Sequence, residues 1–214
     1  MTGSEPRWLV LGFDARESPR RLAGSWPPER REGYLYRPDV ESPLSADRTV
    51  WPSVFERMPD RLPAWTGRVQ GLWEDLSQLR QAASGVDDCW LVAFAVDLAS
   101  CSERAERELE EYLSGFTPGG QPGPRPGPQE IASPHALDSG WEWLGCDVSD
   151  FFGTSGLSNT GFPDIGTLRP EWGPRLNCHH LFDDPRDARG FQAMADERAS
   201  EHSPFFVMGL WRIG

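Results

Sequence analysis

The chain has 214 residues, of which 38% are hydrophobic and 25% are charged, and it carries ten tryptophans. This composition is typical of a globular protein with a sizeable core, and it excludes an intrinsically disordered chain. The formal net charge is −12. A negative field of this size repels nucleic-acid phosphates and anionic lipid headgroups, so it disfavours nucleic-acid and membrane binding and favours a basic protein partner.

All 21 basic residues are arginine, which excludes lysine Schiff-base chemistry and a P-loop lysine. The apolar run near the amino terminus, residues 8–13, is too short for a signal peptide or a membrane span. The cysteines are widely spaced without a C-x-x-C pair, which indicates reduced thiols. We therefore expect a cytoplasmic protein.

Four apolar segments predict the strands of a sheet. Residues 8–13 and 89–98 are continuous apolar runs, as in strands buried on both faces. Residues 141–148 alternate in character and include two tryptophans, and residues 205–213 end the chain in a further apolar run. A shorter edge strand is expected at residues 33–36.

Three segments show the periodicity of amphipathic helices. Residues 63–84 carry an apolar stripe at helical spacing, and residues 102–114 combine a charged face with a short apolar one. Residues 184–202 begin with Asp184 and Pro185, which suit the cap and the first position of a helix. We predict a single α+β domain over residues 1–214, with a central mixed sheet of four to six strands and two or three packed helices.

Two Gly- and Pro-rich segments interrupt this pattern. Residues 119–128 cannot form a helix or a ladder and are expected to be an internal loop. Residues 149–174 predict a long loop, and loops of this length are usually functional. A short repeat also occurs, because residues 11–14 read LGFD and residues 144–147 read LGCD. Glycine and aspartate at strand ends are common turn chemistry, so we do not expect a duplication.

The strongest candidate site follows the strand at residues 141–148. Two aspartates just beyond a strand can hold a divalent metal or act as acid and base. The glycine pattern of the loop matches neither a nucleophile elbow nor a nucleotide-binding motif, so turn capping by these residues is the simpler interpretation. The residues selected here are Asp147, Asp150, Ser155, Asn159 and Asp164.

A second candidate is the sequence Cys178-His179-His180, whose side chains are of the types that bind zinc. Adjacent strand residues point to opposite faces, so only Cys178 and His180 would converge. A site would need further ligands, such as His135 or Cys146. Packing of one residue in the core and exposure of another is the simpler expectation, and we predict no metal and no cofactor.

Tryptophans beside acidic residues, among them Trp172, resemble a protein-binding hot spot, although most of the ten are expected to fill the core. The segments Trp143–Asp150, Ser155–Asn159 and Pro204–Trp211 resemble uncharacterised bacterial cytosolic proteins, some of which are similar to immunity proteins of toxin systems. The resemblance implies a small acidic protein that binds and blocks a cognate toxin, often a basic nuclease. No binding residues carry over from it.

Our leading hypothesis is an acidic protein-binding module that occludes a basic toxin domain. Its contacts are expected in the loop at residues 149–174 and on the acidic helix faces, with Asp147, Asp150, Ser155, Asn159, Asp164 and Trp172 binding the partner. The alternative is a metal-assisted or acid–base hydrolase that uses Asp147, Asp150 and the loop after them.

Overall fold

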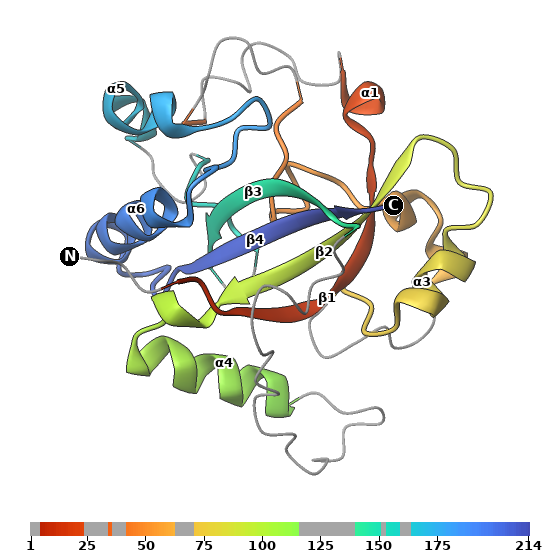
Figure 1. The fold of residues 1–214 in the computed structure, drawn as a ribbon, viewed down its shortest axis with the longest axis horizontal. Coiled ribbons are helices and arrows are strands. Elements are labelled where there is room, and N and C mark those ends of the chain that lie inside the picture. The colour runs from red at the N-terminus through yellow and green to blue at the C-terminus, as the bar shows by residue number, and fades with distance from the viewer. Residues whose placement is uncertain are drawn as a thin grey trace.

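A four-stranded sheet forms the centre of the molecule in a computed structural model (Figure 1). The structure describes residues 5–23, 34–35, 42–62, 71–115, 140–150, 153–158 and 164–214. The strands follow the spatial order β1-β2-β4-β3, and every neighbouring pair is antiparallel. Their bounds are Trp8–Glu17 for β1, Cys89–Asp97 for β2, Glu142–Ser149 for β3 and Phe206–Ile213 for β4.

The predicted α+β class and the four main strands are confirmed, but the sheet is antiparallel instead of mixed. The last residue of β1, Glu17, pairs with the first residue of β2, Cys89. Ser149, at the end of β3, likewise pairs with Phe206 at the start of β4. Each connection therefore starts and ends at the same end of the sheet, whereas a parallel pair needs a crossover to the opposite end.

Each face of the sheet is buried against different helices. On one face, Ala93, Ala95 and Val207 pack with the apolar stripe of helix α6 (Pro185–Arg198). On the other face, Val92 and Phe94 pack with the stripe of helix α4 (Glu103–Gly115). Burial on both faces explains why the β2 and β4 sequences are almost continuously apolar.

Three tryptophans lie together on the face that α6 covers. The ring centroids of Trp8, Trp143 and Trp211 are 4.6 to 5.7 Å apart. They come from β1, β3 and β4, so this cluster joins strands from both ends of the chain. Trp73 and Trp172 are also buried. The expectation that most tryptophans fill the core is therefore confirmed at Trp8, Trp73 and Trp211, whereas Trp172 was expected at the surface.

The helix predicted at residues 63–84 is shorter than expected. Helix α3 spans only Leu76–Ala82, and it begins after Asp75, whose side chain accepts hydrogen bonds from the first-turn amides. Trp73 instead forms an isolated bridge with Phe13 of β1. Pairing with an edge strand therefore outweighs the helical periodicity of Leu72 and Trp73, while residues 63–70 lie outside the described part.

The remaining elements are short. They are α1 (Pro19–Leu22), the 3-10 helices η1 (Val54–Arg57), η2 (Pro59–Arg61), η3 (Leu98–Ser100), η5 (Ile165–Thr167) and η6 (Gly173–Arg175), and α5 (Arg169–Trp172). Helix α5 and η5 lie inside the segment predicted as a long loop, and residues 119–128 are outside the described residues. None of the helices in the described ranges is long and apolar enough to cross a membrane.

Candidate functional site

Asp147, near the end of β3, is fully buried and bound by four hydrogen-bond donors. Its Oδ1 accepts hydrogen bonds from the Val148 amide and the Ser155 hydroxyl, each at 2.7 Å. Its Oδ2 accepts them from the Ser45 hydroxyl at 2.5 Å and the Ala46 amide at 2.8 Å. These donors occupy the lone pairs of both oxygens. The carboxyl group therefore joins β3 to two other segments and presents no open oxygen to solvent.

The electrostatic environment of Asp147 is unusual for a carboxylate. Burial raises the pKa of its carboxyl above the ordinary value, and the four hydrogen bonds oppose this increase. The donors are two hydroxyls and two backbone amides, so the group is held by neutral partners. A raised pKa suits acid–base chemistry only where substrate reaches the group, and here the side chain orders residues 45–46 and 153–158 instead.

Asp150, the second predicted acid, is nearly buried. Its Oδ1 accepts a hydrogen bond from the Thr154 amide at 2.8 Å, and its Oδ2 lies 3.4 Å from Nδ1 of His202. This carboxyl therefore closes the turn after β3 and contacts the turn that follows α6. The structure thus places Asp147, Asp150 and Ser155 near one another at the end of β3, but in the interior.

The other predicted residues lie apart from this group. Asp164 is exposed and pairs with Arg198 of α6. Trp172 is only 7% exposed and packs against Phe182 and Phe191. Asn159 lies outside the described residues. Partner binding by these residues stays a prediction, and Asp164 is the one among them that the structure places at the surface.

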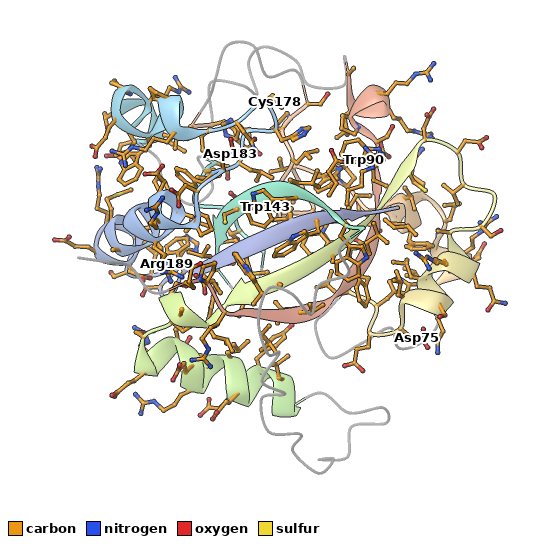
Figure 2. The ribbon with its side chains drawn as sticks, viewed as in Figure 1. Asp75, Trp90, Trp143, Cys178, Asp183 and Arg189 are labelled. Atoms are coloured by element: carbon orange, nitrogen blue, oxygen red, sulfur yellow. The ribbon has the colours of Figure 1, made fainter. Side chains whose placement is uncertain are left out.

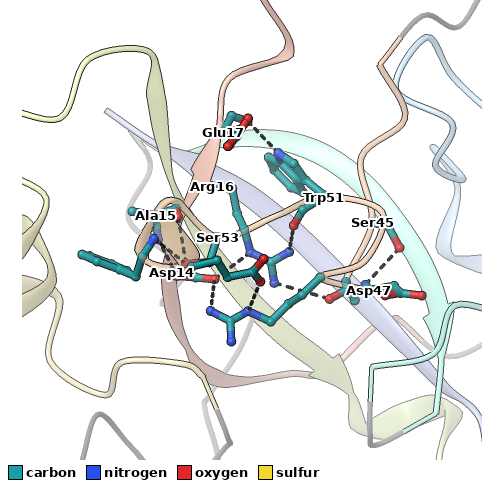
Figure 3. A network of polar contacts seen from close by, with 12 residues as sticks. Asp14, Ala15, Arg16, Glu17, Ser45, Asp47, Trp51 and Ser53 are labelled. Carbon is teal, nitrogen blue, oxygen red and sulfur yellow. Dashed lines mark hydrogen bonds and ion pairs between the residues drawn. The ribbon is translucent and has the colours of Figure 1, made fainter. Parts of the chain in front are cut away.

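A second buried acid, Asp14 of β1, was not selected from the sequence. Figure 3 shows its network: Oδ2 accepts a hydrogen bond from Nε of Arg16 at 2.7 Å, and Oδ1 accepts one from the Ser53 hydroxyl at 2.8 Å. The guanidinium of Arg48 lies 3.5 Å from the same carboxylate. Arg16 is itself only 1% exposed and donates to the carbonyl of Trp51.

Burial is also the main influence on the pKa values of Asp14 and Arg16. It raises the pKa of the Asp14 carboxyl, and the charges of Arg16 and Arg48 oppose the increase. The only sequence signal for this group was the LGFD segment that resembles LGCD at residues 144–147. Apart from Arg16, its side-chain partners Arg48 and Ser53 are distant in the chain, so local patterns did not reveal them.

The Cys178-His179-His180 segment does not form the strand that zinc-ligand convergence requires. His180 is buried with a left-handed backbone (φ 66°) and packs edge-on against Tyr34, whereas Cys178 is exposed. Burial lowers the pKa of the His180 imidazole to about 4. Within the described ranges, no group of three or more His, Cys, Asp or Glu side chains is placed to hold a metal ion, and His135 lies outside them.

The most acidic surface of a described helix is the outer face of α4. Its sequence, ERAERELEEYLSG, contains five glutamates and two arginines, a net charge of −3. Ala105 and Leu109 point into the core, while Glu106 and Glu110 are exposed. The two exposed glutamates are one helical turn apart and therefore lie on the same stripe. Neither makes an ion pair with another described residue.

A comparison with protein-family models found no match to this chain. Neither the curated proteins nor the solved structures contain a match to it. The side chains themselves therefore carry the functional argument. They divide into buried acids that organise the fold and exposed acids on α4.

Proposed function

We propose that this protein is an acidic protein-binding module of the immunity type, which binds a basic toxin domain and occludes its active site. The observation that carries the proposal is the exposed acidic face of α4. The apolar side of α4 packs into the core, so the exposed residues Glu106 and Glu110 can contact a partner without disturbing the fold.

The position of these glutamates supports a binding role over a stabilising one. Acidic residues stabilise a helix at its amino-terminal end, where Glu103 and Glu106 lie. Glu110 lies in the carboxyl-terminal half, where the helix dipole does not favour a negative charge, and the last turn contains no basic residue. The charge distribution of α4 is thus not explained by helix stability. A negative face of this kind accelerates the encounter with a basic partner.

The buried acids support the same choice. The hydrolase alternative depends on Asp147 and Asp150, whose oxygens are engaged in the interior contacts described above. The described geometry offers Asp147 no path to a substrate. We therefore place the partner contacts first on α4, with Asp164 as an additional contact in the loop at residues 149–174.

The proposal is tested by comparative affinity capture from an extract of the source organism. The tagged wild-type chain is compared with Glu106→Lys/Glu110→Lys and with the control Asp60→Lys/Asp87→Lys. The control changes the net charge equally at exposed positions outside α4. We expect one basic protein to be retained by the wild type and by the control and lost from the α4 variant.

The inhibitory role is then measured with the purified partner. Wild-type protein is expected to abolish the partner's activity at equimolar ratio, and the α4 variant to bind at least about tenfold more weakly at low salt. Equal loss of binding in both charge variants would show that only net charge matters and would reject α4 as the site. A captured partner whose activity is unaffected would reject the immunity-type function.

A further inference from the structure

The two edge strands of the sheet carry one sequence signature at equivalent structural positions. Over the seven residues from Trp8 to Asp14 and from Trp141 to Asp147, four positions are identical. In each strand the pairing register shifts at the leucine before the glycine, so the leucine is the extra residue of a β-bulge. The identical pairs are Trp8 and Trp141, Leu11 and Leu144, Gly12 and Gly145, and Asp14 and Asp147.

The residue after each glycine forms the same bridge to a distant segment. Phe13 exchanges two backbone hydrogen bonds with Trp73, at 2.8 and 2.7 Å. Cys146 exchanges two with Phe182, at 2.7 and 2.9 Å. A Cβ atom on either glycine would lie within 3.0 Å of the bridging segment, and both glycines have positive φ. Only glycine therefore permits this approach in each strand.

The two buried aspartates are held in the same way. Oδ1 of Asp14 accepts hydrogen bonds from the amide of the next residue and from the Ser53 hydroxyl, both at 2.8 Å. Oδ1 of Asp147 accepts them from the next amide and from the Ser155 hydroxyl, both at 2.7 Å. Each serine also bridges the residue two positions after the aspartate, Arg16 in β1 and Ser149 in β3.

The bridging segments lead into equivalent helices. Residues 72–75 read LWED and residues 181–184 read LFDD. The last aspartate of each is a helix cap: Asp75 accepts the amide of Ser77 at 2.7 Å, and Asp184 accepts that of Arg186 at 2.8 Å. The capped helices, α3 and α6, each precede one of the two central strands, β2 and β4.

The register of the sheet shows that a twofold axis relates these parts. Gly12 pairs with Phe94 and Gly145 pairs with Leu210, and these two central residues pair with each other. Moving away from this pair in either direction, each residue of β2 pairs with the residue of β4 that is equally far from Leu210 on the opposite side. Ala93 faces Trp211 on one side, and Ala95 faces Gly209 on the other. Figures 1 and 2 show the consequence, because α3 and α6 lie toward opposite ends of the sheet, as do Asp75 and Asp183.

We infer that the chain consists of two copies of one strand–helix–strand unit, residues 7–97 and 140–213, which associate through the edges of β2 and β4. This edge is a self-complementary surface, and the partner that it fits is a second copy of the same unit. Local turn chemistry does not account for the match. The β-bulge, the hydrogen bond from a serine to the buried aspartate, the backbone bridge and the capped helix occur in the same chain order in both units, and one axis relates them.

One difference between the copies is an insertion in the first unit. Ser53 follows Asp14 by 39 residues, whereas Ser155 follows Asp147 by 8. The longer segment of the first unit crosses to the second, where Ser45 and Ala46 bind Asp147. The insertion therefore strengthens an association that the central strands already provide.

The test uses the full chain with a protease site placed within residues 119–128. The purified protein is cleaved, unfolded in urea and refolded as a mixture, and its particles are weighed by native mass spectrometry. We expect a one-to-one pair of the two pieces as the main species. Because β4 is self-complementary about Leu210, we also expect particles containing two carboxyl-terminal pieces, which become more abundant when that piece is in excess.

A cysteine placed at the axis identifies the contact in these particles. In a Cys178→Ser background, Leu210→Cys should allow a disulfide between two carboxyl-terminal pieces under mild oxidation, since the two copies of residue 210 then face each other. The control Ile213→Cys should not, because residue 213 would face residue 207. Refolding that leaves the carboxyl-terminal piece only monomeric or unfolded would overturn the inference, as would equal cross-linking of both variants.

Hydrogen exchange of the intact chain provides a second measurement that does not depend on refolding of the pieces. Two associated units predict that β1, α3 and β2 open together, and that β3, α6 and β4 open together. Opening in which the two edge strands exchange as one group, separately from the two central strands, would contradict the inference.

Discussion

Asp14 and Asp147 occupy equivalent positions in the two halves of the sheet, yet the structure satisfies them differently. Both are fully buried, and their Oδ1 atoms have matching partners. Oδ2 of Asp14 binds the guanidinium of Arg16, whereas Oδ2 of Asp147 binds a serine hydroxyl and a backbone amide. The same backbone arrangement therefore holds one aspartate with a charged partner and the other with neutral partners. We expect the loss of stability on replacing the aspartate to differ between the two sites.

The largest effect is expected for Asp14→Asn, which leaves the Arg16 guanidinium buried without its counter-charge. Breaking a buried pair on one side typically costs about 4 kcal/mol. We expect a loss of this size in the free energy of unfolding, measured by urea denaturation. The control Asp14→Asn/Arg16→Met removes both charges and should recover part of the loss. A cost for Asp14→Asn no larger than that of Asp147→Asn would contradict the comparison.

The next largest effect is expected at the two equivalent glycines, Gly12 and Gly145. Gly12→Ala and Gly145→Ala each place a Cβ against the bridging segment at positive φ, so each should cost about 3 kcal/mol from strain and overpacking. Gly85→Ala is the matched control, because it also has positive φ but nothing lies within 4 Å of the added Cβ. It should cost only about 1 kcal/mol. Thermal unfolding of the three variants gives the order, and a control as damaging as the other two would refute the steric cause.

A smaller loss is expected for Asp147→Asn. The new amide group would point N–H donors at partners that are themselves donors, which leaves buried groups unsatisfied at a cost of about 2 kcal/mol. Ser155→Ala removes a single hydrogen bond and should cost about 1 kcal/mol. Urea denaturation at neutral pH measures both. If Asp147→Asn is as stable as the wild type, the four-donor geometry is not what holds this carboxyl.

The smallest expected effect is a pH dependence of the stability lost in Asp147→Asn. Because burial raises the pKa of Asp147, its contribution to stability is fully present below the ordinary value of 3.8 and is lost as pH rises through the folded-state pKa. Asparagine does not titrate, so the cost of Asp147→Asn should shrink with rising pH, by about 1.4 kcal/mol per unit of pKa shift. Ser155→Ala keeps the carboxyl and serves as the control. A cost that grows with pH would show that the pKa is lowered instead.

The sequence by itself determined the elements whose signals are local. Apolar runs located β2 and β4, alternation located β3, and Asp184 with Pro185 fixed the start of α6, because each pattern reports on burial or capping within a few residues. The acidic face of α4 was equally visible, since the buried and exposed sides of a helix follow its period.

Only the tertiary structure decided where the polar groups and the edge segments go. It buried Asp147 by placing Ser45 against it, a pair 102 residues apart in the chain, and it drew Trp73 out of a helical pattern to bridge β1. It also aligned LGFD with LGCD about one axis, which the sequence alone explained as turn chemistry. These outcomes depend on contacts between distant segments, and no local periodicity or propensity encodes the partner of a buried acid or of a strand edge.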